Sequence, residues 1–153
     1  METVAPSLAS RPMTDAKAAM NDWNAQIIAE FRANGGKAAQ FGDAPLVILH
    51  TIGAKSGALR EIPLVALVQG DDMYVFASRG GAPTNPDWYH NLKANPEIDV
   101  EYGTERFRAR LRELPTDEGQ ARLADQGELH ANFAEYVTSA APRIIPAFAI
   151  ERL

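Results

Sequence analysis

Hydrophobic residues early in the chain recur at helical spacing and predict a helix over residues 14–34. The apolar stripe of this helix is formed by Met20, Trp23, Ile27 and Phe31. Thr14 is the expected cap, and the glycines at 35 and 36 are typical of a helix C-terminus. We expect the stripe to pack on a core; in the alternative, Trp23 covers a ligand or lies on a membrane surface. Residues 1–13 contain two prolines and little periodicity, so we expect a flexible arm.

Apolar and alternating runs then predict a series of β-strands. These runs lie at residues 46–51, 60–69, 73–79, 97–102, 105–114 and 144–153. Turn sequences at 70–72 and 103–104 are expected to join neighbouring strands as hairpins.

Two helical segments interrupt the strands. Asn85 and Pro86 are expected to open a short helix that stops near Asn95, with Asn85 as its N-cap. A longer helical region is expected from 115 to about 140, with a break near Gly127.

Hairpin-linked strands without regular β-α-β alternation argue against a Rossmann sheet. A small, closed or half-closed antiparallel β-barrel with flanking helices fits the pattern best, which is an α+β fold. A length of 153 residues favours one domain, here expected at 14–153.

The strand at 105–114 carries a basic row on one face, formed by Arg106, Arg108, Arg110 and Arg112. The opposite face carries Phe107, Ala109 and Leu111. We expect the arginines to be solvent-exposed and paired with the strand that contains Glu101. The alternative is that they form a ligand wall.

Composition narrows the function classes. A net charge of −5 disfavours a general nucleic-acid binder, and the absence of cysteine excludes disulfides and thiolate chemistry. His50, His90 and His130 show no ligand spacing, so no metal site is expected. The chain has no apolar run of membrane-spanning length and no basic-then-apolar signal pattern, so we expect a cytoplasmic protein.

The stretch from Thr51 to Leu64 is the strongest candidate for chemistry. It places Lys55 and Ser56 between two glycines and adds Arg60 three residues later. Glycine-rich turns with free N–H groups and nearby cations bind phosphate or carboxylate. The alternative is an ordinary polar hairpin turn. Arg79, followed by two glycines, is a second point where a base meets small residues at a strand end.

Three motifs occur together and in order: T-x-G-x-K-S-G-x-x-R-x-x-P-L at 51–64, Y-V-x-A-S-x-G-G at 74–81 and P-x-W-Y-x-N-L-x-A-N-P at 86–96. In this arrangement residues 15–153 resemble the deazaflavin-dependent nitroreductase family, whose members use coenzyme F420. The resemblance implies a split β-barrel related to that of flavin-mononucleotide oxidoreductases. It also implies hydride delivery to a quinone, a nitroaromatic or an activated double bond. A lipid quinone as acceptor would imply peripheral membrane contact.

The resemblance assigns roles by position. The residues implied to hold the cofactor's phosphate and acidic tail are Lys55, Ser56, Gly57 and Arg60. Those implied to lie against the deazaflavin ring are Ile62, Pro63 and Leu64. The opposite wall is assigned to Ala77, Ser78, Arg79 and Gly80, and the helix closing the phosphate end to Trp88, Tyr89 and Asn91. Tyr136 corresponds to a substrate-facing tyrosine, and Tyr136 or Ser78 would donate a hydrogen bond or proton to the reduced group.

Two rival interpretations remain at this stage. One keeps the fold and exchanges the cofactor for flavin mononucleotide (FMN). The other is a non-catalytic deazaflavin carrier or a binding module for another anion. The sequence leaves the natural acceptor and the oligomeric state open.

Overall fold

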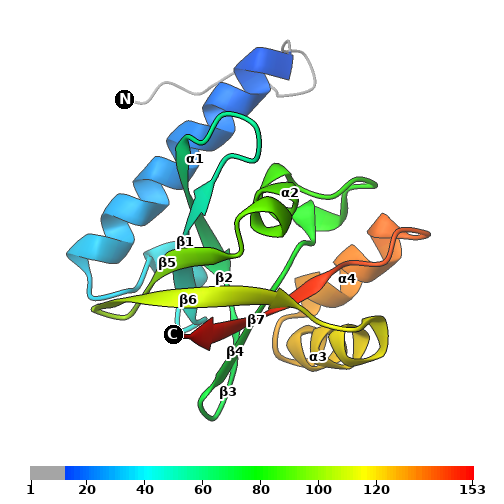
Figure 1. The fold of residues 1–153 in the computed structure, drawn as a ribbon. Coiled ribbons are helices and arrows are strands. Elements are labelled where there is room, and N and C mark those ends of the chain that lie inside the picture. Colours follow the sequence, from blue (N-terminus) through cyan, green and yellow to red (C-terminus); the bar gives the residue numbers. More distant parts are fainter. Residues whose placement is uncertain (1–12) are drawn as a thin grey trace.

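The structure is a computed structural model that describes residues 13–153, with side chains described from residue 21 onward. The elements, shown in Figure 1, are α1 (Met13–Ala33), η2 (Ala39–Phe41), β1 (Leu46–Ile52), β2 (Leu59–Val65), β3 (Leu67–Gln69), β4 (Asp72–Phe76), η3 (Arg79–Gly81), α2 (Asp87–Ala94), β5 (Glu97–Tyr102), β6 (Glu105–Glu113), α3 (Thr116–Leu129), α4 (Ala131–Ala140) and β7 (Ala147–Arg152). The arm expected at 1–13 lies outside the described residues, apart from Met13, which opens α1.

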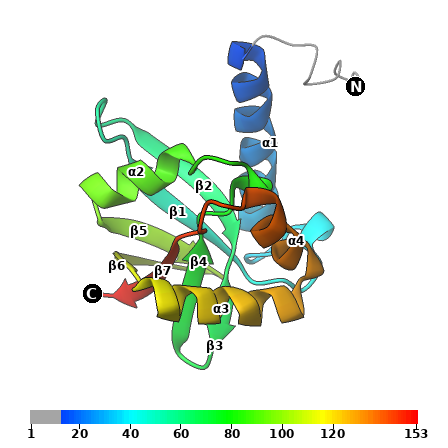
Figure 2. The same ribbon diagram turned by 90° about the vertical axis from the view of Figure 1, so that its right-hand side faces the viewer.

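Seven strands of the described chain form one antiparallel sheet in the order β2-β1-β5-β6-β7-β4-β3. β2 and β3 lie at opposite edges of this sheet, yet only Ala66 separates them in sequence. The sheet must therefore curl until its two edges approach one another, as Figure 2 shows. Ala66 is buried at this junction and donates its N–H to the carbonyl of Pro45 at 2.9 Å. The half-barrel with flanking helices confirms the predicted split-barrel fold.

The two faces of β1 meet different parts of the core. Val47 and Leu49 pack inside the curled sheet with Trp88 and Leu92 of α2. Leu46 and Ile48, on the opposite face, pack with the apolar stripe of α1, which is formed by Ile27, Ile28 and Phe31. Because side chains alternate along a strand, one apolar run serves both layers.

Helix α1 confirms the predicted N-terminal helix. It ends as expected, because Gly35 and Gly36 adopt positive φ and the N–H of Gly36 bonds to the carbonyl of Phe31 at 2.8 Å. Trp23 is 41% exposed and makes an edge contact with the ring of Phe41. The side chains of Thr14 and Met20 lie outside the described part.

Three expected element boundaries are wrong. The strand expected at 60–69 is two strands, because the chain crosses from one sheet edge to the other at Ala66. The strand expected at 73–79 ends at Phe76, where the chain leaves the sheet for the η3 turn. The strand expected from Ile144 begins at Ala147, since the preceding segment binds the loop after β4.

Two predictions about helix ends are also wrong. Asn85 does not cap α2; Pro86 occupies that position, and the Asn85 side chain accepts a hydrogen bond from Arg143. The late helical region breaks at His130 and not at Gly127. Gly127 instead permits close packing of α3 on α4, because a Cβ there would lie 3.3 Å from that of Ala134.

The arginines of β6 form an exposed, ion-paired row, as expected. Their carboxylate partners lie on the neighbouring strands β5 and β7: Asp99, Glu97 and Glu151. The strand that contains Glu101 is β5, so the expected pairing is confirmed, whereas Glu101 itself binds Arg32 and His50. The row is therefore an ion-paired, solvent-exposed sheet face.

Among residues 13–153, no helix combines the length and the hydropathy that are needed to span a membrane.

Candidate functional site

The turn between β1 and β2 is held in a fixed shape by its own backbone. The N–H of Gly53 bonds to the carbonyl of Ala58 at 2.8 Å, and that of Gly57 bonds to the carbonyl of Gly53 at 2.9 Å. Gly57 has a φ of 71°, and a Cβ on Gly53 would lie 2.4 Å from Oγ of Ser56. Gly57 is thus favoured by its left-handed φ and Gly53 by the position of the Ser56 side chain, and Lys55 is left exposed between them.

Helix α2 fastens this turn from the side. Asn91 Oδ1 accepts the N–H of Ala54 at 2.9 Å, and the Nδ2 of Asn95 lies 3.4 Å from the carbonyl of Ile52. The predicted site residue Asn91 therefore binds the backbone of the turn and fixes the position of the turn relative to the core.

Three cations of the predicted site have no carboxylate partner among the described residues. Within the part of the chain whose side chains are described, Lys55, Arg60 and Arg79 form no ion pair, whereas the arginines of β6 all do. Among the described residues, the guanidinium of Arg79 bonds only to the neutral hydroxyl of Thr84. Exposed cations left unpaired in an acidic protein favour an anionic ligand.

The register of β1 and β2 decides which side chains share a face. Arg60, Ile62 and Leu64 lie opposite inward-facing β1 residues, and the two apolar ones are half-buried against the inner core. Pro63 pairs with Ile48, which faces α1, so Pro63 belongs to the other face of the sheet. The structure thus brings together three of the four predicted β2 residues and separates Pro63 from them.

The loop after β4 carries the second predicted group. Ala77 is fully buried, Ser78 is 8% exposed, and the Ser78 hydroxyl makes no hydrogen bond to any described residue. Arg79, Gly80 and Gly81 all have positive φ, at 50°, 61° and 83°. This backbone presents a free hydroxyl and an exposed guanidinium on adjacent residues.

Helix α4 packs directly on this loop. A Cβ on Gly81 would lie 2.8 Å from Cβ of Ser139 and 3.2 Å from Cα of Tyr136. The Tyr136 hydroxyl accepts a hydrogen bond from Nδ2 of Asn132 at 3.0 Å, which leaves its own proton available. The two predicted catalytic residues, Ser78 and Tyr136, therefore lie on the two elements of one packed junction.

Trp88 and Tyr89 lie on α2 and contact the core and β6. Trp88 is buried with its ring 6.2 Å from that of Phe148. The Tyr89 hydroxyl lies 3.3 Å from both carboxylate oxygens of Glu113, which also binds Lys93 at 2.6 Å. Burial and, secondly, the charge of Glu113 raise the pKa of Tyr89. Both residues therefore support α2 from the core.

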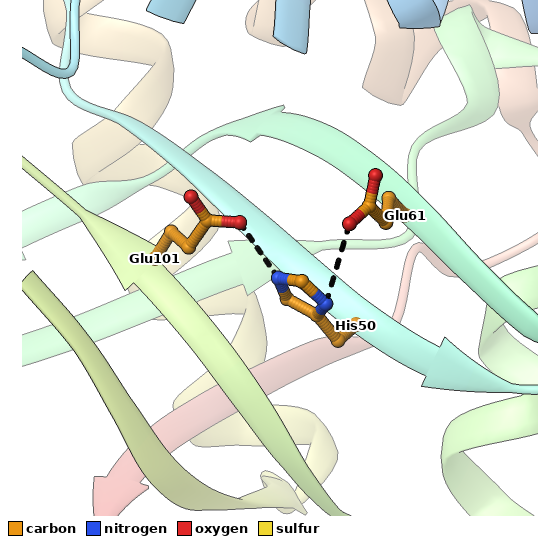
Figure 3. A group of neighbouring side chains, drawn as sticks. All are labelled: His50, Glu61 and Glu101. Carbon is orange, nitrogen blue, oxygen red and sulfur yellow. Dashed lines mark hydrogen bonds and ion pairs between the residues drawn. The ribbon is translucent and has the colours of Figure 1, made fainter. Parts of the chain in front are cut away.

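A charged cluster on the α1 face was missed by sequence reasoning. His50 is buried between two carboxylates, with Nε2 at 2.7 Å from Glu101 and Nδ1 at 3.5 Å from Glu61, as Figure 3 shows. Arg32 from α1 binds both carboxylates, at 2.8 Å to Glu61 and 2.6 Å to Glu101. Hydrogen bonds to Arg32 and then His50 lower the pKa of Glu101.

Ligand atoms of His50, Glu61 and Glu101 lie within 4.8 Å of one another, a spacing at which this group could hold a metal ion. The Arg32 guanidinium, however, already bonds to both carboxylates of the cluster. We interpret the cluster of Arg32, His50, Glu61 and Glu101 as a set of ion pairs that holds α1 against three strands. The hairpin register pairs His50 with Glu61, a signal that was available in the sequence, whereas the approach of Glu101 and Arg32 depends on tertiary packing.

Comparison with known proteins gives a consistent result. The model of the F420H(2)-dependent quinone reductase family matches residues 23–151. An F420H(2)-dependent quinone reductase of Mycobacterium tuberculosis is 38% identical over 113 residues, which cover 72% of this chain and 76% of the relative.

Two solved structures are also similar. One, described as an F420-H2 dependent reductase, has a TM-score of 0.63 and 37% identity over 70% of this chain and 94% of its own. Another, described as a domain-swapped dimer, has a TM-score of 0.65 and 33% identity over 92% of this chain and 100% of its own. With the family model covering most of the chain, the protein belongs to the F420H(2)-dependent quinone reductase family.

Proposed function

We propose that this protein transfers hydride from reduced coenzyme F420 to a quinone, with the cofactor held by the β1–β2 turn, the inner face of β2 and the loop after β4. Family membership makes the protein an F420H2-dependent reductase with coenzyme F420 as its cofactor. The observation that carries the assignment of the site is the set of unpaired cations at Lys55, Arg60 and Arg79.

The β1–β2 turn fits the anionic part of the cofactor, its phosphate and carboxylates. Lys55 supplies a mobile point charge and Arg60 a planar fork that matches two oxygens. The backbone N–H groups of Lys55 and Ser56 have no acceptor among the described residues. An anion bound here would pair with both cations and accept hydrogen bonds from both free N–H groups. An ordinary polar hairpin has no need for this combination of groups.

The inner face of β2 fits the flat ring. Ile62 and Leu64 present half-buried apolar surface beside Arg60, and buried Ala77 belongs to the same core cluster. An apolar surface excludes water from a hydride donor and orients it. Pro63 is placed on the α1 face, so we assign ring contact to Ile62 and Leu64 alone.

When bound, the reduced deazaflavin supplies the hydride; the protein must then stabilise charge on the quinone oxygen. Ser78 has a free hydroxyl at the β4 loop, and Tyr136 keeps a proton to donate because Asn132 bonds to its oxygen. We assign these two side chains as hydrogen-bond donors to the acceptor.

Steady-state reduction of a soluble quinone by reduced F420 under anaerobic conditions tests this function. Tyr136→Phe and Ser78→Ala are each expected to lower kcat by about tenfold to a thousandfold, as loss of a transition-state donor does, with little change in F420 affinity. Tyr102→Phe, in a half-buried tyrosine of β5, is the matched control. Absence of quinone turnover in the wild type, or turnover of nitroaromatics or enones alone, would contradict the proposal.

A further inference from the structure

Arg143 lies between α4 and β7 and binds the whole loop that follows β4. Its Nη1 donates to the carbonyl of Ala77 at 3.0 Å and to Oδ1 of Asn85 at 2.6 Å. Its Nη2 donates to the carbonyls of Ser78 at 2.9 Å and Ala82 at 2.7 Å, and its Nε to Ala82 at 3.1 Å. A single guanidinium thus spans nine residues of loop.

The partners of Arg143 are all neutral. Charged side chains that lose water are normally paired with an opposite charge, because carbonyls replace hydration only in part. Burial and, secondly, the positive charge of Arg79 lower the pKa of Arg143. Arg79 of the loop and Arg143 of the α4–β7 segment are therefore two cations that repel one another, and neither forms an ion pair with a described residue.

The loop also needs outside support. Arg79, Gly80 and Gly81 all adopt left-handed φ, which is unfavourable for a residue with a side chain such as Arg79. The N–H of Gly81 donates a hydrogen bond to the carbonyl of Ser78 at 2.9 Å, which closes the turn internally. Arg143 supplies the bonds that fasten the turn to the segment between α4 and β7.

We propose that Arg143 is a positioning residue: it fixes the Ser78–Arg79 wall of the cofactor site against the α4–β7 segment, so that cofactor and acceptor are held in one geometry. This inference rests on the proposed function for its catalytic consequence. Its structural part, the fixing of residues 77–85, stands independently. Arg143 itself is not among the residues assigned above to the cofactor or the acceptor; it acts through the backbone carbonyls of Ala77 and Ser78, which belong to that wall.

The test compares Arg143→Met, Arg143→Lys and the milder Asn85→Ala, which removes one of the five bonds. Arg110→Met, which breaks an exposed ion pair with Glu97 on the distant β6 row, is the control. Hydrogen exchange of the ligand-free proteins is measured over residues 77–85, followed by F420 affinity, KM and kcat. Arg143→Met is expected to speed exchange in this loop and to weaken F420 binding by about tenfold to a hundredfold.

Arg143→Lys is expected to rescue little, because an ammonium group cannot reach four acceptors in a plane. Asn85→Ala should give a smaller effect in the same direction, and Arg110→Met none. In Arg143→Ala, millimolar methylguanidinium should restore part of kcat, which a mere loss of global stability would not allow.

Unchanged exchange over 77–85 in both Arg143→Met and Asn85→Ala would overturn the inference. So would faster loop exchange with wild-type F420 affinity and kcat, because the residue would then position nothing that matters for the reaction. Failure of the wild type to bind F420 or reduce quinones would instead refute the proposed function, and the exchange result would still decide whether Arg143 holds the loop.

Discussion

The side chain of Asn91 accepts the backbone N–H of Ala54 at 2.9 Å, and this bond joins helix α2 to the glycine-bounded turn between β1 and β2. The turn itself is exposed and short, so its position relative to the core depends on such an anchor. A motif on a helix and a motif on a hairpin, 37 residues apart in sequence, thus form one structural unit.

Asn91→Ala is expected to weaken F420 binding by about tenfold, because the lost hydrogen bond frees the turn that carries Lys55. Hydrogen exchange over residues 53–58 should rise in parallel. Asn91→Asp keeps an acceptor for Ala54 and adds a negative charge near the anion site. If Asn91→Asp bound F420 as well as the wild type, the cofactor's anionic groups would not lie at this turn.

Lys55→Ala combined with Arg60→Ala is expected to weaken F420 binding by about a hundredfold or more, since each charge-assisted hydrogen bond contributes about 1.5–3 kcal/mol. The thermal unfolding temperature should stay close to that of the wild type, because neither side chain forms an ion pair with a described residue. Calorimetry and fluorescence titration measure the two quantities. Lys37→Ala with Arg108→Ala removes the same charge from distant exposed positions and should leave affinity unchanged.

Gly81→Ala is expected to destabilise the protein and lower activity, because the added methyl group would lie 2.8 Å from Cβ of Ser139 and would push α4 from the loop. Gly80→Ala is a matched control: it has a similar left-handed φ, with no atom within 4 Å of its would-be Cβ. The control should cost only the backbone strain of about 1–2 kcal/mol. Equal losses of stability and of kcat in the two variants would contradict close packing at this junction.

Stability below neutral pH should depend on Glu101. Arg32, followed by His50, holds the pKa of Glu101 below its ordinary value of 4.5, so the ionised form stabilises the fold above that pH. This contribution is lost as the pH falls through the lowered folded-state pKa. Glu101→Gln is expected to reduce stability at pH 7 by about 1–3 kcal/mol and to flatten its dependence on pH below 4.5.

Chemical denaturation at several pH values measures this effect. Glu105→Gln, which breaks an exposed ion pair with Arg152, should change stability by less than about 1 kcal/mol at any pH. An equal effect of the two substitutions would show that Glu101 does not tie α1 to the sheet.

Local patterns in the sequence predicted those helices and strand faces that are determined by the spacing of neighbouring apolar residues. The spacing of Ile27 and Phe31 predicted α1, and the alternation around Ala109 and Leu111 predicted which face of β6 is buried. The split barrel followed from hairpin-linked strands and from the resemblance of three motifs. The crossing of the chain at Ala66 from one sheet edge to the other was not predictable. A continuous apolar run does not mark the point at which one strand ends and the next begins at the opposite edge.

Contacts between distant segments account for what was missed at the site. Asn85 has the residue type of a helix cap, but Arg143, 58 positions away, binds its side chain instead. Pro63 was expected to lie against the deazaflavin ring together with Ile62 and Leu64. Because side chains alternate along β2, Pro63 lies on the α1 face instead. The strand that contains Glu101 pairs with the arginines of β6 as expected, but Glu101 itself binds Arg32 from α1, a contact that depends on tertiary packing.

Fluorescence titration of the wild-type protein with oxidised coenzyme F420, beside a titration with FMN, tests the central claim most directly. The account predicts micromolar or tighter binding of F420, which the Lys55→Ala, Arg60→Ala double variant loses, and weaker binding of FMN because it lacks the long acidic tail. Preference for FMN, or equal F420 affinity in the wild type and the double variant, would contradict it.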